Sequence, residues 1–242
     1  LNVDEVRDFF ESRIIGQPAV TELLVNLVTT IKASLNDPER PLGSFLFMGP
    51  TGVGKTESAL TLAEYLFGDR DRLIRLDMSE YGYPGASLRL VGGAHGEGDM
   101  TRPMREQPFC VLLLDEIEKA APEVFDILLQ VLGEGRLTDN TGRMVRFVHA
   151  IVIMTSNLGA ARKAPARFDH GEGDDQTDLQ AHYLDAATRF FRPEFINRID
   201  YLVPFEDLSA DAVRRIAGRM LDSALTREGF ARRDIQVVYQ DD

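Results

Sequence analysis

A glycine-rich octapeptide at residues 49–56 constrains this chain more than any other feature. It reads Gly-Pro-Thr-Gly-Val-Gly-Lys-Thr, a full match to the phosphate-binding pattern Gly-x-x-x-x-Gly-Lys-[Ser/Thr]. It also stands between an apolar run and a segment with helical periodicity, which is the context in which such loops bind phosphate. The chain has only four lysines, so a chance match has a probability on the order of a few per thousand.

The residue types of this loop predict how a triphosphate binds. Its glycines let successive backbone N–H groups point inward, toward the positive end of the helix that opens at Lys55. Lys55 then lies along the β- and γ-phosphates, and the Thr56 hydroxyl is a hard oxygen ligand for Mg²⁺. We therefore expect ATP and Mg²⁺ to bind at Pro50, Thr51, Gly52, Val53, Gly54, Lys55 and Thr56.

Composition narrows the classes of partner. The net charge of −12, from 39 acidic and 27 basic residues, opposes the phosphate attraction on which nucleic-acid binding depends. No apolar stretch approaches the roughly 20 residues that a membrane span needs. The single cysteine, Cys110, adjoins an apolar run, and the four histidines lack metal-ligand spacing. We expect a cytoplasmic protein with no nucleic-acid or membrane partner. Because it begins without Met, we expect a piece of a longer protein.

The order of apolar runs predicts an α/β fold. Five short runs, at residues 45–48, 73–76, 111–114, 151–154 and 201–203, alternate with helical segments. Runs that are apolar at nearly every position suit a parallel sheet covered on both faces. Helices are expected over residues 55–67 and 122–132, with Gly68 and Gly133 ending them.

The remaining segments suggest two domains. Residues 136–147 contain a turn sequence and predict a hairpin, and residues 159–178 predict a surface loop. After residue 204 the pattern changes, with Ser209 expected to cap a helix over residues 210–228 and a strand expected over residues 235–239. We expect a large α/β domain over residues 1–204 and the start of a small helical domain over residues 205–242.

Polar residues at the ends of the apolar runs are candidates for chemistry. Asp115 and Glu116 follow a buried strand at the sheet edge where open α/β proteins bind ligands. Asp115 can hold Mg²⁺, and Glu116 can orient and polarise the attacking water. Alternatively, Asp115 and Glu116 could simply be acidic residues at the start of a helix. The presence of the phosphate loop in the same chain favours the functional interpretation. Asn157 can contact the γ-phosphate or the water, or it can be a turn residue before Gly159.

Several longer motifs resemble one family. They lie at residues 14–17, 49–56, 76–80, 113–119, 128–139, 154–159 and 191–200. Together they are similar to the AAA+ Clp ATPases, in particular the second nucleotide-binding domain of the ClpA, ClpB and ClpC unfoldases and disaggregases. The resemblance implies an AAA+ P-loop NTPase fold with a parallel five-stranded sheet between helices, followed by a helical lid. It also implies an ATPase that remodels protein substrates.

The same resemblance assigns further roles. It implies that Ile14 and Ile15 pack against adenine, that Asn157 is a sensor residue, and that Arg198 is an arginine finger acting across a subunit boundary in a hexameric ring. From sequence alone, Arg198 could instead form a surface ion pair with Asp200 or Glu194.

The chain departs from the family pattern in one loop. Family members carry an aromatic channel loop after Leu-Val-Gly, but here residues 93–99 are shorter and contain no aromatic residue. Tyr81 matches a family aromatic and Tyr83 does not. Either the protein acts on its substrate differently, or Tyr83 substitutes, or loop residues are absent from the chain. We therefore keep an alternative function, a ring ATPase that remodels or scaffolds a protein partner without threading it.

Overall fold

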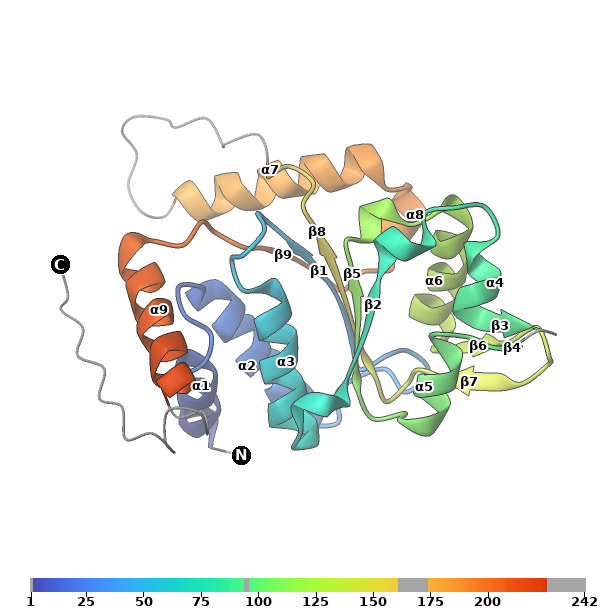
Figure 1. Ribbon diagram of the computed structural model, residues 1–242, viewed down its shortest axis with the longest axis horizontal. Coiled ribbons are helices and arrows are strands. Elements are labelled where there is room, and N and C mark those ends of the chain that lie inside the picture. Colours follow the sequence, from blue (N-terminus) through green and yellow to red (C-terminus); the bar gives the residue numbers. More distant parts are fainter. Residues whose placement is uncertain (1, 94–95, 161–173, 226–242) are drawn as a thin grey trace. The chain divides into compact units, whose positions relative to one another are not determined.

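The computed structural model describes residues 2–93, 96–160 and 174–225 (Figure 1). The chain divides into two compact units, Leu1–Asp207 and Leu208–Asp242. In the described part of the second unit, α9 (Ala210–Leu225) is a helix whose first turn is capped as expected, since the Ala212 N–H donates to the Ser209 hydroxyl at 3.1 Å. The expected strand over residues 235–239 lies outside the described residues.

A parallel five-stranded sheet organises the first unit, as the sequence predicts. The strands pair in the order β2-β5-β8-β1-β9, and every pairing is parallel. Each strand covers one predicted apolar run, and their bounds are β1 Gly43–Met48, β2 Leu73–Asp77, β5 Val111–Asp115, β8 Ile151–Ser156 and β9 Tyr201–Pro204. The carboxyl ends of β5, β8 and β1 consequently lie side by side at one edge.

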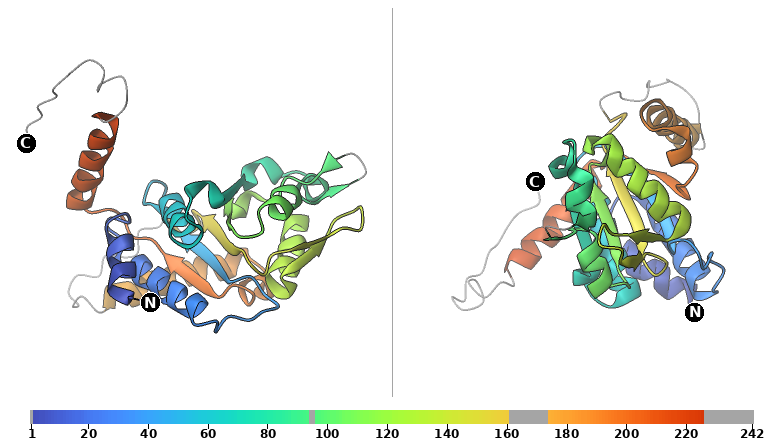
Figure 2. Two further views of the ribbon diagram at one scale, coloured as in Figure 1. Left: turned by 90° about the horizontal axis from the view of Figure 1, so that it is seen from below. Right: turned by 90° about the vertical axis from the view of Figure 1, so that its right-hand side faces the viewer.

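Two apolar cores, one on each face of the sheet, explain why the runs are apolar throughout. On β5, for example, Leu113 faces one core and Leu112 and Leu114 face the other. The first core is covered by α1 Val3–Glu11, α2 Pro18–Lys32 and α3 Lys55–Phe67. The second is covered by α4 Ala86–Val91, α5 Thr101–Glu106, α6 Pro122–Glu134, α7 Asp174–Phe190 and α8 Pro193–Ile196 (Figures 1 and 2).

The helix that follows the phosphate loop has the predicted bounds, but α6 does not end where the sequence predicts. α6 continues through Gly133, and Gly135 ends it with a left-handed φ of 56°. Gly133 has a different function, because a Cβ there would lie 2.1 Å from a guanidinium nitrogen of Arg198. The missing side chain makes room for that arginine.

The other local predictions have mixed outcomes. The expected hairpin forms from β6 Arg136–Thr138 and β7 Met144–Arg146. The expected loop over residues 159–178 is too long, because α7 already begins at Asp174. Residues 161–173 lie outside the described part. The sequence also contained start signals for two helices that were not predicted: the Asn2 side chain caps α1, and Pro18 occupies the first turn of α2.

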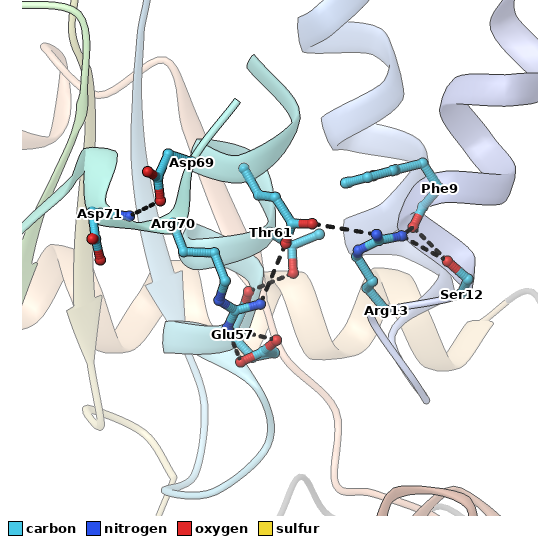
Figure 3. Close-up of polar contacts among 9 residues, drawn as sticks. Phe9, Ser12, Arg13, Glu57, Thr61, Asp69, Arg70 and Asp71 are labelled. Carbon is cyan, nitrogen blue, oxygen red and sulfur yellow. Dashed lines mark hydrogen bonds and ion pairs between the residues drawn. The ribbon is translucent and has the colours of Figure 1, made fainter. Parts of the chain in front are cut away.

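Short elements complete the first unit. They are the 3-10 turns η1 Arg70–Arg72, η2 Met78–Tyr81 and η3 Ile117–Lys119, and the two-residue strands β3 Gly92–Gly93 and β4 Gly96–Glu97. Arg70 of η1 donates to both carboxylate oxygens of Glu57 on α3, at 3.0 and 2.9 Å (Figure 3). Such exposed ion pairs contribute about 0–1 kcal/mol each, so the two cores provide most of the stability.

Every helix within the described ranges is too short or too polar to cross a bilayer.

Close packing at the start of the phosphate loop gives a stability prediction. A Cβ on Gly49 would lie 2.8 Å from the backbone oxygen of Phe205, so Gly49→Ala forces the chain after β9 to move. We expect a loss of about 2–3 kcal/mol in the free energy of unfolding, measured by chemical denaturation.

Gly68→Ala is the matched control. Gly68 has φ of 80°, but a Cβ added to it would meet no atom within 4 Å, so the substitution adds only backbone strain of about 1–2 kcal/mol. Equal losses in the two variants would contradict the packing argument.

Candidate functional site

A cleft of about 530 Å³ opens at the carboxyl edge of the sheet. This volume is typical of small-molecule sites. The phosphate loop and the ends of β2, β5 and β8 form its walls, with the lining residues Thr51, Gly52, Gly54, Lys55, Thr56, Glu57, Leu60, Arg75, Asp77, Asp115, Glu116, Thr155 and Asn157. The structure therefore brings most of the predicted phosphate, metal and catalytic residues together.

Lys55 is buried at the centre of this cleft. Its ammonium donates to the backbone oxygens of Gly49 at 2.5 Å and Pro50 at 2.7 Å, and to the side-chain oxygen of Asn157 at 2.9 Å. Burial lowers the pKa of Lys55 to about 8, against the opposing charges of Glu118, Asp115 and Glu116. A ligand phosphate would give this ammonium the negative partner that backbone oxygens do not provide.

The carboxylate of Asp115 is fixed on both sides. Its Oδ1 accepts from the Thr155 hydroxyl at 2.5 Å, and its Oδ2 accepts from the guanidinium of Arg75 at 2.5 and 3.1 Å. The same Thr155 oxygen accepts from the backbone N–H of Glu116 at 3.0 Å. One buried hydroxyl on β8 thus orients two consecutive acids at the end of β5.

Glu116 has an unusual backbone conformation. Its φ and ψ are 55° and 52°, and Ser34 is the other non-glycine residue with positive φ among those the structure describes. For a residue with a side chain this conformation costs of order 1–3 kcal/mol, and such strain is concentrated at functional sites. It places the Glu116 carboxylate where the Asn157 side-chain amide donates to it at 3.3 Å.

Asn157 consequently links Lys55 to Glu116. Its amide oxygen accepts from the first and its amide nitrogen donates to the second. The turn interpretation and the functional interpretation of Asn157 are compatible, because it directly follows β8 and also faces the cleft.

Four of the residues predicted to bind the nucleotide do not line the cleft. Two belong to the phosphate loop and two were expected to pack against adenine. Pro50 contributes its backbone oxygen to Lys55, and Val53 is buried in the core. Ile14 and Ile15 are also buried, with exposed fractions of 6% and 9%. Their contact with adenine remains a prediction. Nearby, the buried amide of Gln17 donates to the backbone oxygens of Val53 and Glu206, which ties the start of α2 to the phosphate loop.

Arg198 lies away from the cleft of its own chain. It is exposed, and its guanidinium lies against Gly133 of α6. Neither acidic neighbour named as a possible ion-pair partner contacts it. Asp200 forms an ion pair with Arg40 and accepts from the Ser44 hydroxyl, and Glu194 lies beside Arg192. Within the described part of the chain, the surface ion pair expected as an alternative is therefore not formed.

Sequence reasoning did not identify several residues of the site. Arg75 and Asp77 alternate with apolar residues on β2, which is the signal that could have placed them on one side of that strand. Thr155 immediately precedes Ser156 and Asn157, and no pattern distinguishes its hydroxyl from that of a buried strand threonine. Glu118 lies two residues beyond Glu116, and its contact with the Asn157 backbone depends on tertiary structure.

The donor set of the cleft fits Mg²⁺. Thr56 and Asp115 supply a hydroxyl and a carboxylate, the hard oxygen ligands that Mg²⁺ prefers, and both line the same cleft. Within residues 2–225 where described, no group of three or more His, Cys, Asp or Glu side chains is arranged to hold a metal.

A second cavity, of about 210 Å³, is apolar and lies between α6 and α8. Phe125, Phe191 and Phe195 line it, and Arg192 is its charged residue. Because it lacks a phosphate cradle and acids, it is not the candidate site.

Comparisons with known proteins agree with this site. Residues 40–202 match the family described as AAA domain (Cdc48 subfamily). The chain is 44% identical over 245 residues to the chaperone protein ClpB of Vibrio cholerae, covering 98% of this chain and 28% of that protein. It is 44% identical over 237 residues to the negative regulator of genetic competence ClpC/MecB of Bacillus subtilis, covering 94% of this chain and 29% of that protein.

A solved structure is also similar. The closed-state cryo-EM reconstruction of Hsp104 with ATPγS and FITC casein has a TM-score of 0.80 and 34% identity, over 93% of this chain and 39% of that chain. This chain spans less than a third of the length of the curated relatives described above.

The lowered pKa of Lys55 predicts how ATP affinity changes with pH. Phosphate binding needs the charged ammonium, whose pKa is about 8 before the ligand binds. Affinity should be nearly constant below about pH 7, because the ammonium is already protonated there. It should fall about tenfold between pH 7 and pH 9, because protonating Lys55 then costs binding free energy.

Calorimetric titration at several pH values measures this effect. Lys55→Arg is the control, since a guanidinium stays charged throughout this range and its residual affinity should not show the alkaline decrease. A wild-type affinity that is flat to pH 9 would show that the free ammonium is not neutralised in this range.

Proposed function

Because this chain belongs to the AAA domain family and is an ATPase module of the Clp type, we propose that its cleft binds ATP with Mg²⁺ and hydrolyses it to drive the remodelling of polypeptides. The observation that carries the proposal is the continuous contact from Lys55 through Asn157 to Glu116 within one cleft. It joins a phosphate-binding cation to a carboxylate suited to act as a base.

Binding begins at the phosphate loop. The N-terminus of α3 and the loop amides offer donors to the phosphates, and Lys55 exchanges its backbone acceptors for phosphate oxygens. Thr56 and Asp115 would hold Mg²⁺, which would supply positive charge to offset that of the phosphates. Because Arg75 occupies one oxygen of Asp115, direct coordination through that oxygen requires the guanidinium to move aside.

Glu116 then directs hydrolysis. Its carboxylate orients a water and accepts a proton as the water oxygen attacks the γ-phosphorus and the bond to the β-phosphate oxygen breaks. The products are ADP and inorganic phosphate. Asn157, which donates to Glu116, keeps the carboxylate in place and is positioned to sense the γ-phosphate through its contact with Lys55.

Arg198 acts on a neighbouring copy. Its exposure, and its lack of a polar partner within the described residues, leave the guanidinium available to another chain. In a ring, expected to be a hexamer, it would stabilise charge on the phosphoryl group in the adjoining cleft. Hydrolysis then depends on assembly.

The substrate is a polypeptide. Relatives of this chain are named as chaperones, and the similar Hsp104 reconstruction contains casein. In the segment that carries the altered loop, Tyr81 is buried and its hydroxyl donates to Asp99. Tyr81 is therefore part of the protein interior and is not exposed to a substrate. Tyr83 is 47% exposed and is the aromatic available for a polypeptide contact. The similarities favour a chaperone module over a scaffold that does not thread. We place its activity in the cytoplasm, without nucleic acid.

A single amide substitution tests the role of the proposed base. Glu116→Gln keeps the shape of the side chain but cannot accept the proton, so we expect ATP affinity within a few-fold of wild type and hydrolysis slower by about 10²–10⁴. Glu22→Gln, which alters an exposed carboxylate paired with Arg7, serves as the control. Steady-state phosphate release from the full-length assembly that loses nothing in Glu116→Gln would remove this base from the mechanism.

Mixing two inactive variants tests the finger in trans. Arg198→Ala should bind ATP normally but lose about 10³-fold or more in rate, and Lys55→Ala should not bind ATP. In a mixed ring, some Arg198→Ala subunits, whose clefts are intact, lie beside Lys55→Ala subunits, which keep Arg198. We expect the mixture of the two variants to recover hydrolysis that neither shows alone. If co-assembled rings stay inactive at every mixing ratio, Arg198 does not act across the boundary.

A further inference from the structure

A buried carboxylate oxygen beside the cleft has no partner. Glu118 Oε2 is the one buried side-chain nitrogen or oxygen without a hydrogen-bond partner among the described residues. Folded proteins rarely leave such atoms unsatisfied, because burying a polar group without a hydrogen bond costs free energy. An apolar side chain at this position would avoid the cost. We therefore expect the Glu118 carboxylate to have a role other than packing.

The other oxygen of Glu118 has a specific contact. Oε1 accepts from the backbone N–H of Asn157 at 3.0 Å. Glu118 belongs to η3, which follows β5, and Asn157 follows β8. Since β5 and β8 are neighbours in the sheet, this bond ties together the two strand ends that carry Glu116 and Asn157.

The contact fixes a residue whose side chain has two functions. Asn157 accepts from Lys55 at 2.9 Å and donates to Glu116 at 3.3 Å. These side-chain contacts need the Asn157 backbone at a set distance from both partners. On the adjoining strand position, Thr155 fixes Asp115 and the backbone of Glu116 in a similar way. Glu118 is thus a further cross-link between the same strand ends.

We propose that Glu118 is a positioning residue for ATP hydrolysis, which holds the Asn157 backbone so that the Asn157 amide keeps Glu116 aligned with the attacking water. The inference rests on the proposed function. Glu118 is not one of the residues that line the cleft, and it acts through Asn157. Its negative charge also opposes the effect of burial on the pKa of Lys55, as the largest of the charge contributions there.

Two substitutions separate the hydrogen bond from the charge. Glu118→Ala removes the acceptor, and we expect kcat to fall about 10- to 100-fold with KM for ATP within about twofold, because a misplaced base slows chemistry more than binding. Glu118→Gln keeps an acceptor for the Asn157 N–H, and we expect kcat within about threefold of wild type.

A double variant tests whether the effect passes through Asn157. Asn157→Ala combined with Glu118→Ala should be no slower than Asn157→Ala alone, because residues that act as one unit are not additive. Glu123→Ala is the matched control. Glu123 also accepts from a backbone N–H, but from that of Gly85 and not of Asn157, so its substitution should leave kcat unchanged.

Hydrogen exchange at the Asn157 amide tests the bond without relying on turnover. Protection should fall in Glu118→Ala and persist in Glu118→Gln, at unfolding midpoints that match wild type. Equal rates for wild type and Glu118→Ala, or a Glu118→Gln variant as slow as Glu118→Ala, would overturn the inference while leaving the ATPase assignment intact. A wild-type assembly that does not hydrolyse ATP would instead defeat the proposed function and this inference with it.

Discussion

The burial of both faces of one parallel sheet is the constraint on which the site depends. Leu112 and Leu113 illustrate it, since consecutive side chains on β5 fill different cores. A shift of one residue in strand register would exchange the two faces, and each would present the wrong side chains to its helices. Register is therefore strongly specified, and with it the alignment of Asp115 and Asn157, which lie at the ends of neighbouring strands. The cost of holding polar and strained groups at this edge is offset by packing elsewhere.

At that edge, Lys55 and Asp115 already have hydrogen-bond partners within the protein. Lys55 is bound by three oxygens, and Arg75 is paired with Asp115. In the proposed function, binding of a nucleotide exchanges these partners for phosphate and metal contacts. We expect such an exchange to move Asn157 and Arg75, because both side chains would change partner. The side-chain contacts at the sheet edge would then depend on whether the bound nucleotide has a γ-phosphate.

Much of this arrangement could be predicted from sequence because local patterns carry it. The phosphate loop, the strand runs and the helix from Lys55 to Phe67 follow from glycine placement and hydrophobic periodicity. Local sequence patterns do not predict contacts between segments that are far apart in the chain. The bond from Glu118 to Asn157 spans 39 positions and depends on which strands are neighbours. The predicted end of α6 at Gly133 was wrong, because Gly133 stays helical and Gly135, two residues later, takes the left-handed φ of 56° that ends the helix. The resemblance to Clp ATPases named Arg198, but only the structure shows that its expected ion-pair partners bind other residues.

The central claim is that this cleft takes up an adenine nucleotide through Lys55. The most direct measurement is calorimetric titration of the folded protein with a slowly hydrolysed ATP analogue, with and without Mg²⁺, beside Lys55→Ala. We expect one site per chain, tighter binding when Mg²⁺ is present, and no uptake by the variant at the same concentrations. Absence of heat with the wild-type protein, or equal uptake by Lys55→Ala, would contradict it.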